Sequence, residues 1–209
     1  MAPVVSAAQV VGGAVMFGDK HEGGFRAILV KISARAAASG HPLDAEVVRS
    51  TPKRYLRAME EMTAGYDEDP REILSTVFDG PSDLVMLRGV RFQSLCEHHA
   101  LPFTGTAMVA YLPRGGRIAG LSKLARLVDC FARRLQVQER MTSQIAEALV
   151  SEPLCAEGAA VVVRGRHACV ECRGVGKIGA EMVTSSMVGR FRDDPALRAE
   201  VMRLEGCHD

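Results

Sequence analysis

Two short segments of the sequence combine cysteine and histidine side chains at spacings that suit a metal ion. Cys96-Glu97-His98-His99 contains one thiol and two imidazoles, and His167-Ala168-Cys169 supplies another pair about seventy positions later. Zinc favours sulfur and nitrogen ligands in tetrahedral geometry, and a catalytic site uses three protein ligands and leaves the fourth position for water. Two cysteines and one histidine would meet that requirement. A structural zinc site, and core cysteines beside surface histidines, are the alternatives at this point.

The second segment lies in a stretch whose composition, AAVVVRGRHACVECRG at 159–174, is typical of a strand. Strand side chains alternate between faces. In an extended segment His167, Cys169, Glu171 and Arg173 would therefore share one side of the strand. That side would present a metal ligand, a possible proton donor and a cation. Cys172 forms a Cys-x-x-Cys pair with Cys169, a spacing also found in structural zinc sites and redox pairs. Alternation points the two sulfur atoms in opposite directions, and we therefore predict that Cys172 is an ordinary buried residue.

The composition sets limits on the rest of the molecule. The chain has 209 residues, 47% hydrophobic and 24% charged, enough for one sizeable core and an additional helical arm. A formal net charge of +1 gives no general attraction to nucleic acid or to an anionic membrane, so any anion binding must be local.

The sequence also bears on location and redox state. It has no apolar run near the roughly 20 residues that cross a bilayer, and its start lacks the basic region of a secretory signal, so we expect a cytoplasmic protein. Six cysteines are too sparse for a disulfide scaffold in a chain of this length, which favours metal binding.

The hydrophobic pattern predicts the elements that position these residues. Residues 1–24 are small and Gly-rich, typical of a flexible extension. Helical spacing follows over 25–38, and Ser50-Thr51-Pro52 is typical of an N-cap with proline in the first turn. Further along we expect strands over 84–96, 105–113 and 159–174, and helices over 122–135, 137–149 and 195–204. Because strands and helices do not alternate regularly, we predict an α+β fold, with an antiparallel sheet and its helices on one face.

Several of these segments, in this order, resemble motifs of the GTP cyclohydrolase I family. The similarity runs from about Thr51 to Leu204 and includes Thr184-Ser185-Ser186. The motifs are Thr51-Pro52-Lys53-Arg54, Ser94-Leu95-Cys96-Glu97-His98-His99, Gly120-Leu121-Ser122-Lys123-Leu124, Gln136-Val137-Gln138-Glu139-Arg140, His167-x-Cys169 and Arg173-Gly174.

The resemblance implies a fold, an assembly and a cofactor. The fold is the tunnelling fold, in which subunits join their sheets into barrels and form a toroidal homodecamer with active sites between subunits. Residues 25–80 would form an N-terminal helical region and 81–209 the catalytic domain. Each subunit would bind one Zn²⁺ through Cys96, His99 and Cys169, while His98 and His167 would transfer protons.

The same resemblance implies the substrate, GTP. Glu139 matches the carboxylate that anchors guanine, whose N1–H and amino group are donors, and Gln138 beside it is also expected to bind the substrate. Ser122 lies where a substrate-contacting hydroxyl is expected. The expected triphosphate-binding cations are Arg54, Lys123, Arg126 and Arg173.

The implied reaction hydrolyses the guanine imidazole ring at C8, releases formate and gives 7,8-dihydroneopterin triphosphate, a precursor in the folate and pterin pathway. Some neighbouring positions depart from the family pattern: Arg164, Arg166, Ala168 and Glu171. Glu171 would place a negative charge beside Arg173. A related cyclohydrolase of 7-deazaguanine or other specialised metabolism, and a non-catalytic zinc- or nucleotide-binding protein, are therefore alternative hypotheses.

Overall fold

The computed structural model describes residues 17–80 and 83–206. Its contacts divide the chain into two compact units, and the boundary in the sequence lies between Met62 and Thr63. In the described residues, no helix is long and apolar enough to span a membrane.

The first unit consists of the helices α1 (Asp19–Ala38) and α2 (Ala45–Thr63), whose Phe25 and Tyr55 rings stack with centroids 4.2 Å apart. Helix α1 begins inside the segment 1–24 assigned to an extension, and 1–16 lie outside the described residues. The expected helix start at Ser50-Thr51-Pro52 is wrong. The Asp44 carboxylate accepts the Glu46 N–H at 2.7 Å, so α2 starts there, and Pro52 lies within the helix.

The second unit is built on a five-stranded sheet in the order β5-β2-β3-β6-β7, antiparallel except for the β2–β5 pair. Its strands are β2 (Val85–Cys96), β3 (Pro102–Leu112), β5 (Leu135–Gln136), β6 (Gly158–His167) and β7 (Met182–Gly189). A smaller antiparallel pair joins β1 (Val77–Asp79) to β4 (Arg117–Ala119). The strands expected over 84–96 and 105–113 are confirmed, whereas β7 was not predicted.

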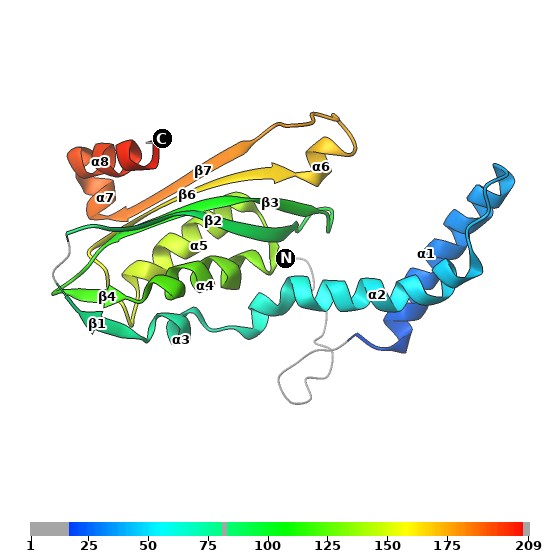
Figure 1. Ribbon diagram of the computed structural model, residues 1–209, viewed down its shortest axis with the longest axis horizontal. Helices are drawn as coiled ribbons and strands as arrows, with labels where there is room; N and C mark the ends of the chain where they lie inside the picture. The colour runs from blue at the N-terminus through cyan, green and yellow to red at the C-terminus, as the bar shows by residue number, and fades with distance from the viewer. Residues whose placement is uncertain (1–16, 81–82, 207–209) are drawn as a thin grey trace, which may run out of the picture. The chain divides into compact units, whose positions relative to one another are not determined.

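Helices pack against both faces of this sheet, so the prediction of helices on one face is only partly correct. The longer ones, α4 (Leu121–Ala132) and α5 (Gln138–Val150), cover one face, and α7 (Arg190–Asp193) and α8 (Pro195–Gly206) pack on the other (Figure 1). Two short elements, the 3₁₀ helix Ala64–Asp67 and α3 (Pro70–Leu74), precede β1.

The β3 sequence explains the two-sided packing. Val109 and Tyr111 face the α4 and α5 core, while Met108 and Ala110 face Phe191 of α7 and its neighbours in α8. All four β3 side chains are buried. A strand covered on both faces has a continuous apolar sequence without alternation, and such a sequence does not indicate how many layers cover it.

Candidate active site

A tight turn after β2 brings the first two predicted metal ligands together. The N–H groups of His99 and Ala100 donate to the Cys96 carbonyl at 3.3 and 2.8 Å, and the Cys96 N–H donates to the Leu101 carbonyl at 2.8 Å. Ala100 has φ +49°, which turns the chain back into β3. The Cys96 Sγ and His99 Nδ1 atoms therefore lie 3.7 Å apart.

The third predicted ligand comes from a helical turn, which corrects the expectation of a continuous strand. Strand β6 ends at His167, and α6 (Ala168–Glu171) follows, with the Cys172 N–H donating to the Ala168 carbonyl at 2.9 Å. Strand alternation therefore does not apply beyond His167. The prediction that Cys172 is buried is wrong: its side chain is exposed, while Cys169 packs partly buried against the core.

The three side chains form a donor set that fits zinc. One ligand atom from each of Cys96, His99 and Cys169 lies within 4.8 Å of the others. Ligand atoms of a tetrahedral zinc site are about 3.5–3.8 Å apart, so modest movement would close the site. Burial and then the neighbouring Cys96 raise the pKa of the Cys169 thiol. A divalent cation would remove this penalty, because it stabilises both thiolates.

His167 is held beside this donor set by two side chains. Its ring stacks on Phe103, with centroids 4.4 Å apart and planes inclined by 5°, and its Nε2 lies 2.9 Å from the Gln138 Oε1. Burial lowers the pKa of His167, an effect that the negative charge of Glu139 partly opposes. Burial therefore favours the neutral form of His167, which can accept a proton.

His98 occupies a different environment. Its side chain is 65% exposed, and its Nδ1 lies 3.9 Å from the Cys96 Sγ. Glu97, the residue between Cys96 and His98 in the sequence, forms an ion pair with Arg140. The hydrogen bond from Arg140 holds the pKa of the Glu97 carboxyl below its usual value. The exposed His98 ring also lies near this carboxylate, with its Nε2 3.9 Å from the Glu97 Oε1.

The remaining predicted residues are dispersed over the chain. Glu139, in the first turn of α5, and Arg173, after α6, are both exposed. Ser122 and Lys123 lie in the first turn of α4, a helix of 12 residues and therefore about 18 Å long. Its other end leads to β5, which pairs with Cys96, so Ser122 and Lys123 lie far from the donor set. Arg126 is exposed on α4, and Arg54 belongs to the first unit.

Two sets of contacts near the site were not predicted from the sequence. Phe103 faces His167 in the β3–β6 register, a relationship that pairing of the two strands would have revealed. Glu171 accepts hydrogen bonds from the Arg166 Nε at 2.8 Å and the Gly179 N–H at 3.0 Å. Its charge is therefore paired, which removes the expected conflict with Arg173.

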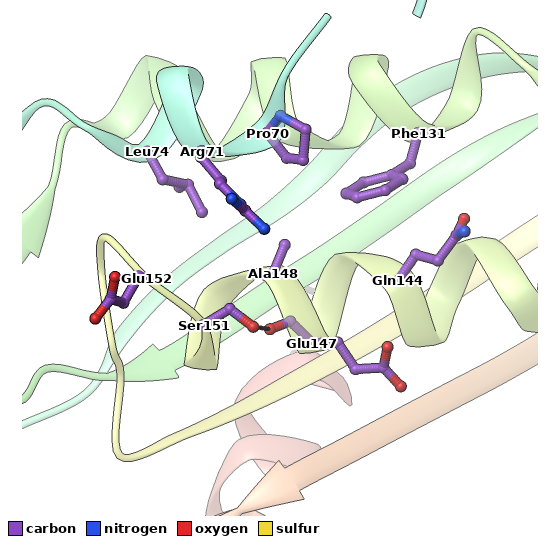
Figure 2. Close-up of a pocket in the computed structure, with 9 residues that line it drawn as sticks. All are labelled: Pro70, Arg71, Leu74, Phe131, Gln144, Glu147, Ala148, Ser151 and Glu152. Atoms are coloured by element: carbon purple, nitrogen blue, oxygen red, sulfur yellow. Dashed lines mark hydrogen bonds between the residues drawn. The ribbon is translucent and has the colours of Figure 1, made fainter. Parts of the chain in front are cut away.

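A separate pocket of about 240 Å³ lies between α3 and α5 (Figure 2). Arg71 points into it from α3, and the facing part of α5 contributes Gln144 and Glu147. None of the predicted site residues lines this pocket, which is therefore separate from the Cys/His donor set.

Comparison with known proteins agrees with this combination of an α+β sheet and a Cys/His group that could hold a metal ion. The family described as GTP cyclohydrolase I matches residues 30–205. GTP cyclohydrolase 1 of Bacillus pumilus (strain SAFR-032) is 48% identical over 166 residues, covering 79% of this chain and 87% of the relative. The enzyme of the same name from Coxiella burnetii (strain Dugway 5J108-111) is 47% identical over 175 residues, covering 83% and 94%. The chain belongs to the GTP cyclohydrolase I family.

Among solved structures, the apo form of an archaeosine synthase QueF-Like is similar, with 20% identity and a TM-score of 0.43. The match covers 53% of this chain and 97% of that chain.

Proposed function

We propose that this protein hydrolyses the guanine imidazole ring of GTP at C8, releases formate and forms 7,8-dihydroneopterin triphosphate. The observation that carries the proposal is the convergence of Cys96, His99 and Cys169, the last of them two residues along the chain from the partly buried His167, in a chain that belongs to this family. A purely structural zinc site would need neither His98 nor His167.

The side chains divide the work of the reaction. Cys96, His99 and Cys169 would hold zinc, which when bound supplies Lewis acidity and lowers the pKa of water towards ~7. Guanine C8 is poorly electrophilic, and protonation of N7 makes it more so. His167 is positioned to hold that proton, and His98 to move protons at the exposed side of the site.

GTP would be recognised at its two ends. The Glu139 carboxylate would accept from guanine N1–H and the amino group, and the cations Arg54, Lys123, Arg126 and Arg173 would bind the triphosphate. Because Ser122 and Lys123 lie about a helix length from the donor set of their own chain, we propose that a complete site combines residues of adjacent subunits in a homodecamer.

Product analysis of the zinc-loaded chain tests the function. We expect about one zinc per chain, formate release and a product that becomes a fluorescent pterin after oxidation. Formate without dihydroneopterin triphosphate would reject the proposed product and point to a specialised cyclohydrolase. Zinc-loaded protein that leaves every purine nucleotide intact would reject catalysis.

A further inference from the structure

Gln138 opens α5 with a side chain that is almost completely buried, at 1% exposure. Its amide nitrogen lies 3.2 Å from the Val163 carbonyl, 3.0 Å from the Met182 carbonyl and 3.1 Å from the Thr184 hydroxyl. Backbone carbonyls can only accept hydrogen bonds. The reversed amide would press its oxygen against two carbonyl oxygens, so only one orientation of Gln138 is compatible with its surroundings.

Two threonine hydroxyls support the same orientation. Thr142 donates to the Gln138 backbone carbonyl at 2.7 Å, and its Oγ1 lies 2.7 Å from that of Thr184. Each hydroxyl has a single proton. Thr184 must then donate to Thr142 and accept from the Gln138 amide nitrogen. Each donor and acceptor in this closed chain of hydrogen bonds is therefore fixed.

The Gln138 amide oxygen consequently faces His167. The Oε1–Nε2 distance is 2.9 Å, and a Cβ atom added at Gly165 would lie only 2.3 Å from this Oε1. The glycine thus leaves the space that the amide oxygen occupies. Since an amide oxygen only accepts, the proton of this hydrogen bond belongs to the His167 Nε2.

We propose that Gln138 is a positioning residue that fixes His167 as its Nε2–H tautomer, leaving Nδ1 as the nitrogen that exchanges a proton with the substrate. The inference deepens the proposed function, on which its catalytic part rests. It also gives Gln138 a role other than the substrate contact that the sequence analysis assigned to it. The stacked Phe103 ring fixes the plane of the imidazole, and Gln138 fixes its hydrogen-bonding edge.

Solid-state ¹⁵N NMR of the full zinc-loaded chain, with ring-labelled histidine, tests the tautomer directly. The chain has six histidines, and His167→Asn identifies the signal to assign. At about pH 8, above the ordinary pKa of histidine, we expect a protonated Nε2 and an unprotonated Nδ1. A protonated Nδ1 in the wild-type protein would overturn the proposal, and this measurement needs no variant at Gln138.

Gln138→Met tests the consequence, because methionine has similar length but cannot accept from His167. We expect mixed tautomers and a kcat about 10- to 100-fold lower, with KM changed less than about 3-fold and zinc content unchanged. Gln144→Met removes an amide from the same helix and should alter neither the His167 spectrum nor kcat.

Two further outcomes separate the hypotheses. A raised KM with unchanged kcat and tautomer in Gln138→Met would mean that Gln138 binds substrate, and would overturn the positioning role. An Nε2–H tautomer that Gln138→Met disturbs, in a protein inert towards GTP, would support the positioning role and reject the proposed function.

Discussion

The His167 imidazole lies parallel to the Phe103 ring, at a centroid distance of 4.4 Å, and the two residues are direct partners in the β3–β6 register. Phe103 also makes an edge-to-face contact with Phe92, at 5.8 Å. Strand pairing therefore places a rigid apolar surface beneath the histidine that we assign to proton transfer.

Replacing Phe103 should affect catalysis as well as stability. Phe103→Leu leaves an apolar residue but removes the flat support, and we expect kcat to fall about 10-fold. The free energy of unfolding should decrease by about 1–3 kcal/mol, because a buried ring loses contacts. Steady-state kinetics and urea denaturation measure the two effects.

Phe92→Leu is the matched control, since it opens a similar space without touching His167. It should destabilise the fold while kcat stays near the wild-type value. Equal losses of kcat in both variants would show that general loosening of the core, and not the stacked ring, is responsible.

Substitutions at Cys169 and His167 should distinguish metal binding from proton transfer. Cys169→Ser should lose zinc and turnover together, because serine is a poor zinc ligand. His167→Ser should keep zinc and GTP binding but lose most activity. Metal analysis and binding of GTP by calorimetry provide the measurements, and a zinc-free His167→Ser beside a fully loaded Cys169→Ser would reverse the assignment.

Glu171 should anchor the loop that carries Arg173. Its carboxylate joins Arg166 to the Gly179 N–H, and Glu171→Ala removes both hydrogen bonds. We expect faster hydrogen exchange at Gly179 and a KM for GTP raised about 3- to 10-fold, with kcat little changed, since the loss is in ground-state binding. Glu181→Ala removes a nearby carboxylate that pairs with Arg164, and should leave exchange at Gly179 unaltered. Unchanged hydrogen exchange at Gly179 in Glu171→Ala would show that Glu171 does not anchor this loop.

The pH dependence of stability should contain a contribution from Cys130. Burial raises the pKa of this thiol above its usual value of 9.0, although Arg134 partly opposes the effect. Above about pH 9 the unfolded chain loses this proton while the folded chain retains it, so the free energy of unfolding should decrease. Cys130→Ala should flatten that decrease between about pH 8 and 10 in urea denaturation, whereas exposed Cys172→Ala should not. Parallel slopes in all three proteins would contradict the assignment.

Spacing alone predicted two cysteines and one histidine as ligands, and the resemblance to the family named them as Cys96, His99 and Cys169. The structure brings one ligand atom of each within 4.8 Å of the others. The helical turn at Ala168–Glu171 was not predictable from strand composition, because no proline precedes it and its N-cap residue, His167, makes no side-chain capping hydrogen bond.

The surroundings of the site depend on contacts between distant segments. The hydrogen-bond partners of the Gln138 side-chain amide lie 25 to 46 positions away, and no local pattern indicates that this amide faces a histidine. Similarly, Phe191 and Val201 cover the second face of the sheet only because the chain returns after β7. Fold class and the main strands and helices followed from periodicity, whereas these long-range contacts required the structure.

Glu139 should determine the preference for guanine. Guanine presents N1–H and an amino group to a carboxylate, whereas adenine has no N1–H donor and would leave that carboxylate partly unpaired. In the single chain Glu139 is exposed in the first turn of α5, where a carboxylate is also compatible with the helix dipole. Glu139→Gln replaces one acceptor with an amide donor that meets the donors of guanine. We expect kcat/KM for GTP to fall about 100-fold, since hydrogen bonds to charged groups contribute about 1.5–3 kcal/mol each.

Glu147→Gln is the control for this change, because it neutralises an exposed carboxylate on the same helix. Both variants should bind zinc like the wild-type protein. Their assembly is compared first by light scattering, since a dissociated oligomer would imitate a pocket defect if sites lie between subunits. With assembly intact, only Glu139→Gln should lose GTP turnover. Wild-type turnover of ATP at a rate close to that of GTP would mean that Glu139 does not select the base.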